Sequence, residues 1–449
     1  MSNGNRRQMS GADAMWLGAD LDSQLMVIDA IMWTDEPLDW AEVRKVLEER
    51  LVATYPVFRQ RPVESSWPWV LPSWEDDPDF RLSRHVHHAR LRAPGDDARL
   101  QAFLEKKVSR PLDRDRPLWE MWFVDGYRGG SVVLSRFHHA MADGIALAQV
   151  MMTLTDPDPD APAPEPAPEP GRPGGERPSL LSGAVRGVLS LPGLPVLGVR
   201  SVQVAQKVLL DALPRSVLNG KPGPAKRLTW SQPRGIDEVK RISRATDATV
   251  NDVLVAALSG ALARYLDTRG QVVEHLTTMV PVNLRPLDRP LPRELGNKFA
   301  LVLLHLPTGE LEPLERLREV NRRMTSIKHS PESVITSAVA EGIGYLHAIE
   351  RPFVDFFAAK AVGVTTNVAG PREPRYLAGR KVAGVLGWVP GSGRQTLGVC
   401  IYSYAGTVRI GFKVDARVVP TPELLVAAFD EELDALTEAV VAGEGPGDT

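Results

Sequence analysis

The chain has almost no cysteine and no long apolar run. Cys400 is the only cysteine among 449 residues, which excludes an intramolecular disulfide and a metal cluster built on several thiolates. The longest charge-free stretch in the apolar middle region covers residues 187–199 and contains two prolines, whereas a membrane-spanning helix needs about 20 apolar residues. The N-terminus reaches Asp13 before any long apolar run, unlike a secretory signal peptide. We therefore expect a cytoplasmic protein without a transmembrane helix.

The chain also lacks an excess of charge of either sign. Its 53 Lys and Arg residues face 56 Asp and Glu residues, which gives a net charge of −3, and no long basic run is present. This balance argues against a nucleic-acid partner. A hydrophobic share of 43% and a charged share of 24% are ordinary for a globular protein.

Proline is concentrated in one segment, which marks a domain boundary. Residues 156–178 contain nine prolines, and such a segment favours extended geometry over a packed core. Because 449 residues exceed the usual size of one hydrophobic core, we expect two domains, at 1–155 and 227–449, joined by residues 156–226. Within the connection, residues 179–220 are apolar with scattered cations. They are interpreted either as crossover helices packed on the domains or as an amphipathic segment that touches lipid.

Both halves mix predicted strands and helices, so the fold class is α/β or α+β. Hydrophobic periodicity predicts helices over 39–55, 145–155, 247–270, 313–330 and 422–442. It predicts strands over 80–91, 131–137, 274–284, 297–307, 361–370 and 396–415.

The stretch "SRFHHAMADGIALAQVM", residues 135–151, lies where a predicted strand gives way to a predicted helix. His138 and His139 are adjacent and point in different directions, so they do not suit one metal ion. No glycine-flanked serine suggests a nucleophilic triad. The remaining interpretations are a single histidine acting as a general base and a pair of structural histidines. Asp143 could simply cap the helix, and Gly144 could simply relieve packing.

Other polar residues have structural interpretations of equal weight. In "TVND", Thr249 and Asp252 have the spacing of a capping box. His85 and His87 share a strand face but lack a nearby acid, so no metal site is expected there. Asn367 fits a turn at the end of a strand, and Trp119 could equally be a plain core residue.

The chain resembles a known family through an ordered series of motifs. "HHAMADG" is similar to the His-His-x-x-x-Asp-Gly signature of coenzyme-A-dependent acyltransferases, a superfamily that includes chloramphenicol acetyltransferase and peptide-synthetase condensation domains. Further stretches resemble the bacterial wax ester synthase/diacylglycerol acyltransferase family: "MSGADAMWL", "FRLSRHVHHARL", "RPLWEMWFVDG", "TVNDVLVAALSGALARYL", "PVNLRP", "LGNKF", "TTNVAGP" and "YSYAGTVRIGFKVD". The similarity runs from about residue 9 to 440 and leaves the proline-rich insert unmatched.

The resemblance implies two chloramphenicol-acetyltransferase-like α/β domains with an active-site tunnel at their interface. It implies that His139 is the catalytic base and that His138 supports the corner. Asp143 would hold the loop by pairing with an arginine, for which Arg59, Arg61 and Arg285 are candidates. The remaining residues expected to line or brace the site are Gly144, Asn251, Asp252, Trp119, Thr366 and Asn367, with Asn251 and Thr366 as guesses for the oxyanion donors.

The function implied is transfer of a fatty acyl group from acyl-CoA, as co-substrate, to diacylglycerol or a long-chain alcohol. No metal or other cofactor is expected, and the enzyme could work peripherally at a membrane or lipid droplet. Two alternatives stay open. One is a condensation-type or polyketide-associated acyltransferase with another acceptor, and the other is a non-catalytic lipid-binding or droplet-coating protein.

Overall fold

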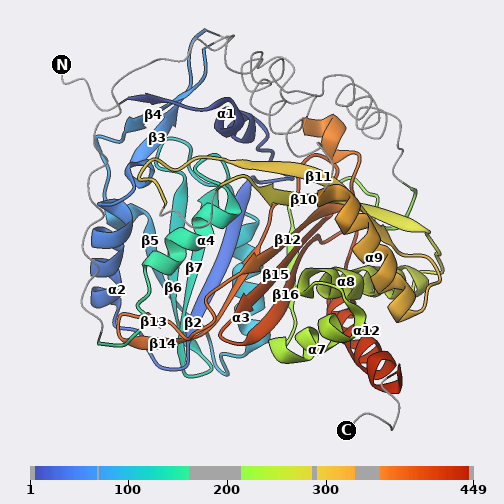
Figure 1. Ribbon diagram of the computed structural model, residues 1–449. Helices are drawn as coiled ribbons and strands as arrows, with labels where there is room; N and C mark the ends of the chain where they lie inside the picture. The colour runs from blue at the N-terminus through green and yellow to red at the C-terminus, as the bar shows by residue number, and fades with distance from the viewer. Residues whose placement is uncertain (1–5, 68–69, 161–213, 286–290, 329–353, 444–449) are drawn as a thin grey trace, which may run out of the picture.

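Two β-sheets lie side by side in the computed structural model, each covered by helices (Figure 1). The structure describes residues 6–67, 70–160, 214–285, 291–328 and 354–443. The predicted connection at 156–226 therefore lies mostly outside the described residues, as does nearly all of the apolar segment 179–220. The mixed α/β class agrees with the sequence prediction.

The first sheet has six strands in the order β13-β14-β2-β7-β6-β5. Its central strand β7 is buried at every position, because both of its faces are covered. All neighbours pair antiparallel except β5 and β6, which are parallel and joined by helix α3. The strands are β2 (Val27–Thr34), β5 (Val86–Arg90), β6 (Trp119–Tyr127), β7 (Gly130–His138), β13 (Tyr376–Leu377) and β14 (Arg380–Trp388).

The second sheet has seven strands, in the order β11-β10-β12-β15-β16-β8, with β9 also paired to β16. The predicted strand pair over 396–415 is the antiparallel hairpin β15–β16, and β12 runs parallel to both β10 and β15. The strands are β8 (Lys226–Trp230), β9 (Arg234–Gly235), β10 (His275–Asn283), β11 (Phe299–Pro307), β12 (Gly363–Ala369), β15 (Leu397–Tyr404) and β16 (Thr407–Asp415).

The second half of the chain contributes two strands to the first sheet. Strand β14 follows residue 227 in the chain, yet it pairs with β2 of the first sheet, and Leu386 faces Ile31 in the register. The second half of the sequence thus completes the first sheet. The predicted boundary at residues 155 and 227 separates the strands of the two sheets except for β13 and β14. These two strands follow the boundary in the sequence but belong to the first sheet.

Helices pack on both sheets. Helix α8 packs against α7, α9 and α12 on the second sheet, while α1 and α4 belong to the core of the first half (Figure 1). A small three-stranded sheet lies beside the first half, with β1 (Arg7–Gln8), β3 (Gln60–Val63) and β4 (Ser73–Asp76) in the order β1-β4-β3. The helices are α1 (Gly11–Gly18), α2 (Trp40–Val46), α3 (Asp97–Val108), α4 (Gly144–Thr153), α7 (Ile236–Thr246), α8 (Val250–Asp267), α9 (Pro313–Lys328) and α12 (Glu423–Gly443).

The interface between the halves contains a buried ionic network. Lys413 of β16 lies 2.7 Å from a carboxylate oxygen of Asp29 on β2, and Arg136 of β7 lies 2.9 Å from the other oxygen. Arg136 also pairs with Glu120 at 2.6 Å. Charges removed from water are stable only when they are paired and hydrogen bonded in this way. The network therefore links β2 and β7 of the first sheet with β16 of the second.

Candidate active site

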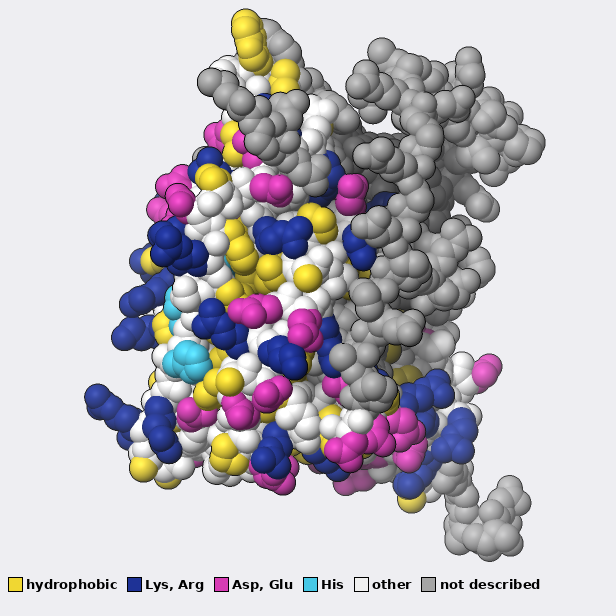
Figure 2. Space-filling model, turned by 90° about the vertical axis from the view of Figure 1, so that its left-hand side faces the viewer, with side chains coloured by type: hydrophobic (Ala, Val, Ile, Leu, Met, Phe, Trp, Pro, Cys, Tyr) yellow, Lys and Arg dark blue, Asp and Glu magenta, His cyan; other side chains and the backbone are white. Residues whose placement is uncertain are grey.

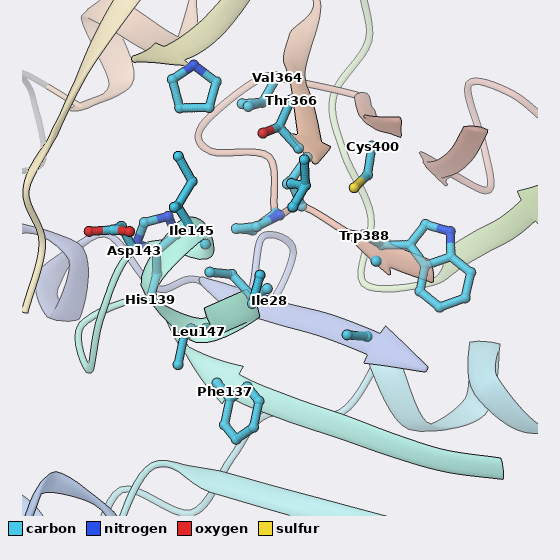
Figure 3. A pocket seen from close by; sticks show the side chains of 18 of the residues that line it. Ile28, Phe137, His139, Asp143, Ile145, Leu147, Val364, Thr366, Trp388 and Cys400 are labelled. Carbon is cyan, nitrogen blue, oxygen red and sulfur yellow. The ribbon is translucent and has the colours of Figure 1, made fainter. Parts of the chain in front are cut away.

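A largely apolar cavity lies between the halves, and the empty space in this region, open solvent at its mouth included, is about 1180 Å³. Strands β2 and β7 and helix α4 form one wall, and β10, β11, β12, β14 and β15 contribute the other (Figure 3). Five methionines supply flexible side chains that adapt to the shape of an apolar ligand. They are Met26, Met32, Met151, Met152 and Met279.

His139 lines this cavity at the point where β7 ends. Its backbone N–H donates to the carbonyl of Met26 at 2.7 Å, which ties the corner to the residue preceding β2. Its ring stacks on Trp16 with the ring centres 4.6 Å apart and packs against Phe299 at 5.4 Å. Burial between these aromatic side chains lowers the pKa of His139 to about 4. The imidazole is therefore neutral at pH 7, which is the form that can accept a proton.

One ring nitrogen of His139 is already engaged. Nδ1 lies 3.0 Å from the amide oxygen of Asn297, which belongs to the segment leading into β11. An amide oxygen only accepts hydrogen bonds, so Nδ1 carries the ring proton in this contact. Nε2 is then the nitrogen with a free lone pair.

Asp143 organises the loop that follows the histidines. One carboxylate oxygen accepts from the backbone N–H of Ala146 at 2.8 Å, which caps helix α4. The other accepts from the backbone N–H of Lys298 at 3.1 Å and lies 3.2 Å from Arg285. Among the three arginines considered from the sequence, Arg285 is the partner. Asp143 is buried, so its role combines the helix cap with an ion pair between the halves.

His138 supports the corner from the opposite face of β7. Its side chain is almost fully buried, and Nδ1 accepts from the backbone N–H of Ala140 at 3.1 Å. Nε2 faces the carboxylate of Asp20 at 3.6 Å. His138 is not among the residues that line the cavity, and it holds the turn that presents His139.

One predicted residue of the second half, Thr366, and the first residue of α4, Gly144, also line the cavity. Thr366 enters it from β12 with its hydroxyl on the side of Asp143 and His139 (Figure 3). Gly144 lines the cavity as well, and a Cβ placed there would touch only the end of Ile28. Cys400 lines the cavity as well, but burial raises the pKa of its thiol to about 12, which makes it a poor nucleophile.

Comparison with known proteins identifies the family. Residues 9–254 match the model of the wax ester synthase/diacylglycerol acyltransferase catalytic domain, and residues 295–437 match the C-terminal domain of the same family. The chain belongs to the wax ester synthase/diacylglycerol acyltransferase family. It is therefore an acyltransferase, as the motifs in the sequence predict.

Individual relatives agree with this family assignment. A probable diacylglycerol O-acyltransferase of Mycobacterium tuberculosis is 29% identical over 387 residues, 81% of each chain. A putative diacylglycerol O-acyltransferase of the same organism is 29% identical over 471 residues and covers 98% of this chain and 99% of its own.

Solved structures show the same fold. The wax ester synthase/diacylglycerol acyltransferase of Marinobacter aquaeolei has a TM-score of 0.70 at 21% identity and covers 97% of this chain and 100% of its own. The first condensation domain of the calcium-dependent antibiotic synthetase has a TM-score of 0.64 at 17% identity, with coverage of 100% and 98%. The two-domain fold expected from the family motifs is confirmed.

Trp119 lies away from the cavity, contrary to the sequence prediction. Its indole N–H donates to the backbone carbonyl of Phe58 at 2.9 Å, and its ring stacks on His85 at 4.7 Å. Trp119 is 2% exposed and belongs to the core of the first half. The Pro-Leu-Trp element of the family is a packing element in this chain.

The Asn251-Asp252 pair also lies outside the cavity lining. Asp252 closes the predicted capping box with Thr249 and accepts from Asn321 of α9 at 3.0 Å, so it stabilises the start of α8. Asn251 accepts a hydrogen bond from Asn367 at 2.8 Å, next to Thr366 in the chain. Asn367 itself is exposed. Asn251 is thus tied to β12 beside Thr366, but neither Asn251 nor Asp252 is among the residues that line the cavity.

Three residues of the site carried no assigned role in the sequence analysis. They are Asp13, Trp16 and Asn297, and all three contact His139 or its amide partner. All three lie in stretches that resemble the family: Asp13 and Trp16 in "MSGADAMWL", and Asn297 in "LGNKF". Neither stretch lies near the histidine pair in the sequence, so only the fold places them there.

Within the described ranges, no three His, Cys, Asp or Glu side chains are grouped closely enough to hold a metal ion.

Proposed function

We propose that the protein transfers a fatty acyl group from acyl-CoA to the hydroxyl of diacylglycerol or a long-chain alcohol, forming triacylglycerol or a wax ester. The observation that carries the proposal is the position of His139, a neutral imidazole on the wall of a large apolar cavity between the halves. A long hydrocarbon chain gains about 0.8 kcal/mol for each buried CH₂ group in such a cavity.

In the proposed reaction, Nε2 of His139 removes the hydroxyl proton while the alcohol oxygen attacks the thioester carbonyl. The new C–O bond gives a tetrahedral oxyanion, and cleavage of the C–S bond releases coenzyme A as a thiolate. The imidazolium returns its proton to that thiolate, so all atoms and charges balance. A positioned base of this kind contributes about 10²–10⁴ to the rate.

The oxyanion needs a hydrogen-bond donor aimed at the carbonyl. Thr366 presents a hydroxyl to the cavity from β12, and we assign it this role. The mechanism uses no covalent acyl-enzyme and no cofactor besides acyl-CoA as co-substrate. Cys400 takes no part, because its thiol stays protonated.

The direct test is incubation of the purified protein with radiolabelled palmitoyl-CoA and either dioleoylglycerol or hexadecanol, followed by thin-layer chromatography. We expect labelled triacylglycerol or wax ester. A need for a carrier-protein thioester in place of acyl-CoA would favour the condensation-type alternative. Absence of both esters, with lipid bound and the thioester intact, would favour a lipid-binding protein and overturn the proposal.

We further propose that the enzyme meets its lipids at a membrane or droplet surface from the cytoplasm. None of the helices in the described part of the chain has both the length and the hydropathy to span a bilayer. Trp67, between β3 and β4, is 63% exposed, and an exposed tryptophan suits a lipid–water interface. The face in Figure 2 mixes charges of both signs with apolar side chains, and no large patch of one charge dominates it.

Flotation with liposomes tests the lipid contact. We expect Trp67→Ser to float less than the parent protein, with an equal melting temperature. Equal flotation of the two would remove Trp67 from the proposed contact.

A further inference from the structure

Asn297 makes four hydrogen bonds that connect His139 with Asp13. Its amide oxygen contacts Nδ1 of His139 at 3.0 Å. Its amide nitrogen donates to Oδ1 of Asp13 and to the backbone carbonyl of His139, each at 2.8 Å. Its backbone N–H donates to the same oxygen of Asp13 at 2.9 Å. Asp13, on α1, is 1% exposed.

These contacts define which way the amide of Asn297 points. The carboxylate of Asp13 and the carbonyl of His139 are pure acceptors, so each requires the NH₂ group of Asn297. A rotated amide would place its oxygen against two other oxygens and its NH₂ against Nδ1. The observed orientation is therefore the one that satisfies all partners, and it leaves only an acceptor facing the ring.

We propose that Asp13 and Asn297 are positioning residues that hold His139 in the tautomer with the proton on Nδ1. The Nε2 lone pair then stays available to the incoming hydroxyl. A neutral imidazole in the other tautomer has a proton on Nε2 and cannot act as the base. The inference rests on the proposed role of His139 and adds the groups that make that role possible.

The arrangement also makes the base depend on both halves of the protein. Asp13 and His139 come from the first half, whereas Asn297 leads into β11 of the second sheet. The next residue, Lys298, donates its backbone N–H to Asp143 at 3.1 Å. Two consecutive residues of the second half thus hold the first and last residues of the His139–Asp143 loop. The base is complete only when the halves are docked.

Nitrogen-15 NMR of the histidine rings reads the tautomer directly, because a protonated and an unprotonated ring nitrogen have well-separated shifts. The signals of His139 are assigned as those lost in His139→Gln. We expect a protonated Nδ1 and an unprotonated Nε2 in the parent protein. In Asn297→Leu, which removes the acceptor but keeps a branched side chain, we expect both tautomers.

Kinetics provide the second readout. A wrong tautomer costs a Ser-His-Asp hydrolase about 10⁴ in kcat, and a mixture costs less, so we expect Asn297→Leu to lower kcat by about 10²-fold. The KM for palmitoyl-CoA should change by less than about twofold, because Asn297 touches no substrate in the proposed reaction. Asp13→Ala should act in the same direction. Asp13→Asn keeps an oxygen acceptor for Asn297 and should restore both kcat and the parent tautomer.

Asp20→Asn is the matched control for the spectrum, since it changes the same kind of group beside His138 instead. It should leave the His139 signals in place. A parent spectrum with protonated Nε2, or an Asn297→Leu spectrum and kcat like those of the parent, would overturn the inference. If the parent protein forms no ester but Asn297→Leu still loses the parent tautomer, the result counts against the proposed function and not against this inference. Melting temperatures identify a variant that fails to fold. If either Asn297→Leu or Asp13→Ala does not fold, the spectrum and kcat of the other test the inference.

Discussion

Asp143 and Arg285 form an ion pair across the interface between the halves, with 3.2 Å between their nearest charged atoms. Asp143 also caps helix α4, so one carboxylate starts the helix behind His139 and joins it to the second sheet. The His-His-x-x-x-Asp-Gly motif is therefore a structural unit as much as a chemical one. Its second histidine, His139, and Asp143 face the cavity, while His138 faces the core.

Substitution of Asp143 separates these two roles. Asp143→Ala removes the cap and the ion pair, and loss of an N-cap alone costs about 1 kcal/mol in the free energy of unfolding. Asp143→Asn keeps the capping oxygen but loses the charge. We expect Asp143→Ala to be the less stable of the two in denaturant titrations, and both to turn over more slowly. Unchanged melting temperature and turnover in Asp143→Ala would contradict this.

The pH dependence of kcat/KM follows from the lowered pKa of His139. The base must be neutral, so activity should stay level as the pH falls from 8 and decline only near the folded pKa of about 4. An unperturbed histidine would give the decline near pH 6.5. A half-maximal rate near pH 6.5 in the free enzyme would show that His139 is not held in a desolvating site.

The same pKa affects stability. In the unfolded chain His139 takes up a proton below about pH 6.5, whereas in the folded protein it stays neutral to about pH 4. The unfolded state thus binds more protons in this window, and the group lowers the free energy of unfolding as the pH falls. His139→Gln should lose this part of the pH dependence when the two proteins are unfolded in urea from pH 7 to pH 4. Equal pH slopes for both proteins would be inconsistent with the assigned pKa.

The cavity wall should select the length of the hydrocarbon chain. Ala148 lies on α4 and lines the cavity, so Ala148→Phe places a ring where methylene groups would lie. We expect kcat/KM for palmitoyl-CoA to fall by about 10-fold or more relative to butyryl-CoA, since several buried CH₂ groups at about 0.8 kcal/mol each are lost. Ala427→Phe, on an exposed position of α12, is the control. If Ala148→Phe leaves the ratio of kcat/KM for palmitoyl-CoA to that for butyryl-CoA unchanged, the acyl chain does not lie beside Ala148.

The buried network at the interface should contribute to stability. Lys413→Met keeps the side-chain length but removes the charge that pairs with Asp29. Breaking a buried pair costs about 3 kcal/mol, so the urea midpoint should shift clearly. Arg380→Met removes the exposed pair with Glu36 and should cost less than about 1 kcal/mol. Equal effects of the two substitutions would mean that the buried network does not fix the interface.

Sequence reasoning found the parts of the site that are local in the chain. The strand ending at His138, the helix capped by Asp143 and the capping box at Thr249 all rest on short-range patterns, and the structure contains each of them. Asp13 and Asn297 were missed because they reach His139 from positions 126 and 158 residues away, counted as 139 − 13 and 297 − 139. Hydrophobic periodicity in the sequence does not indicate contacts between residues so far apart in the chain.

Two further features depend on tertiary structure alone. Strand β14 joins the first sheet from the second half of the chain, which no boundary drawn from composition can show. Trp119 was predicted to line the site, but it finds a hydrogen-bond acceptor in Phe58 and a stacking partner in His85 within the core. From the sequence alone, a large aromatic residue in a strand can face either a ligand cavity or the core, and only its neighbours in the fold decide between the two.

The most direct test of the central claim is the esterification rate of His139→Ala, measured with radiolabelled palmitoyl-CoA and both acceptors. Removal of a general base should lower kcat by about 10²–10⁴-fold, with a melting temperature close to that of the parent protein. Full turnover in a folded His139→Ala protein would show that the imidazole of His139 is not the base.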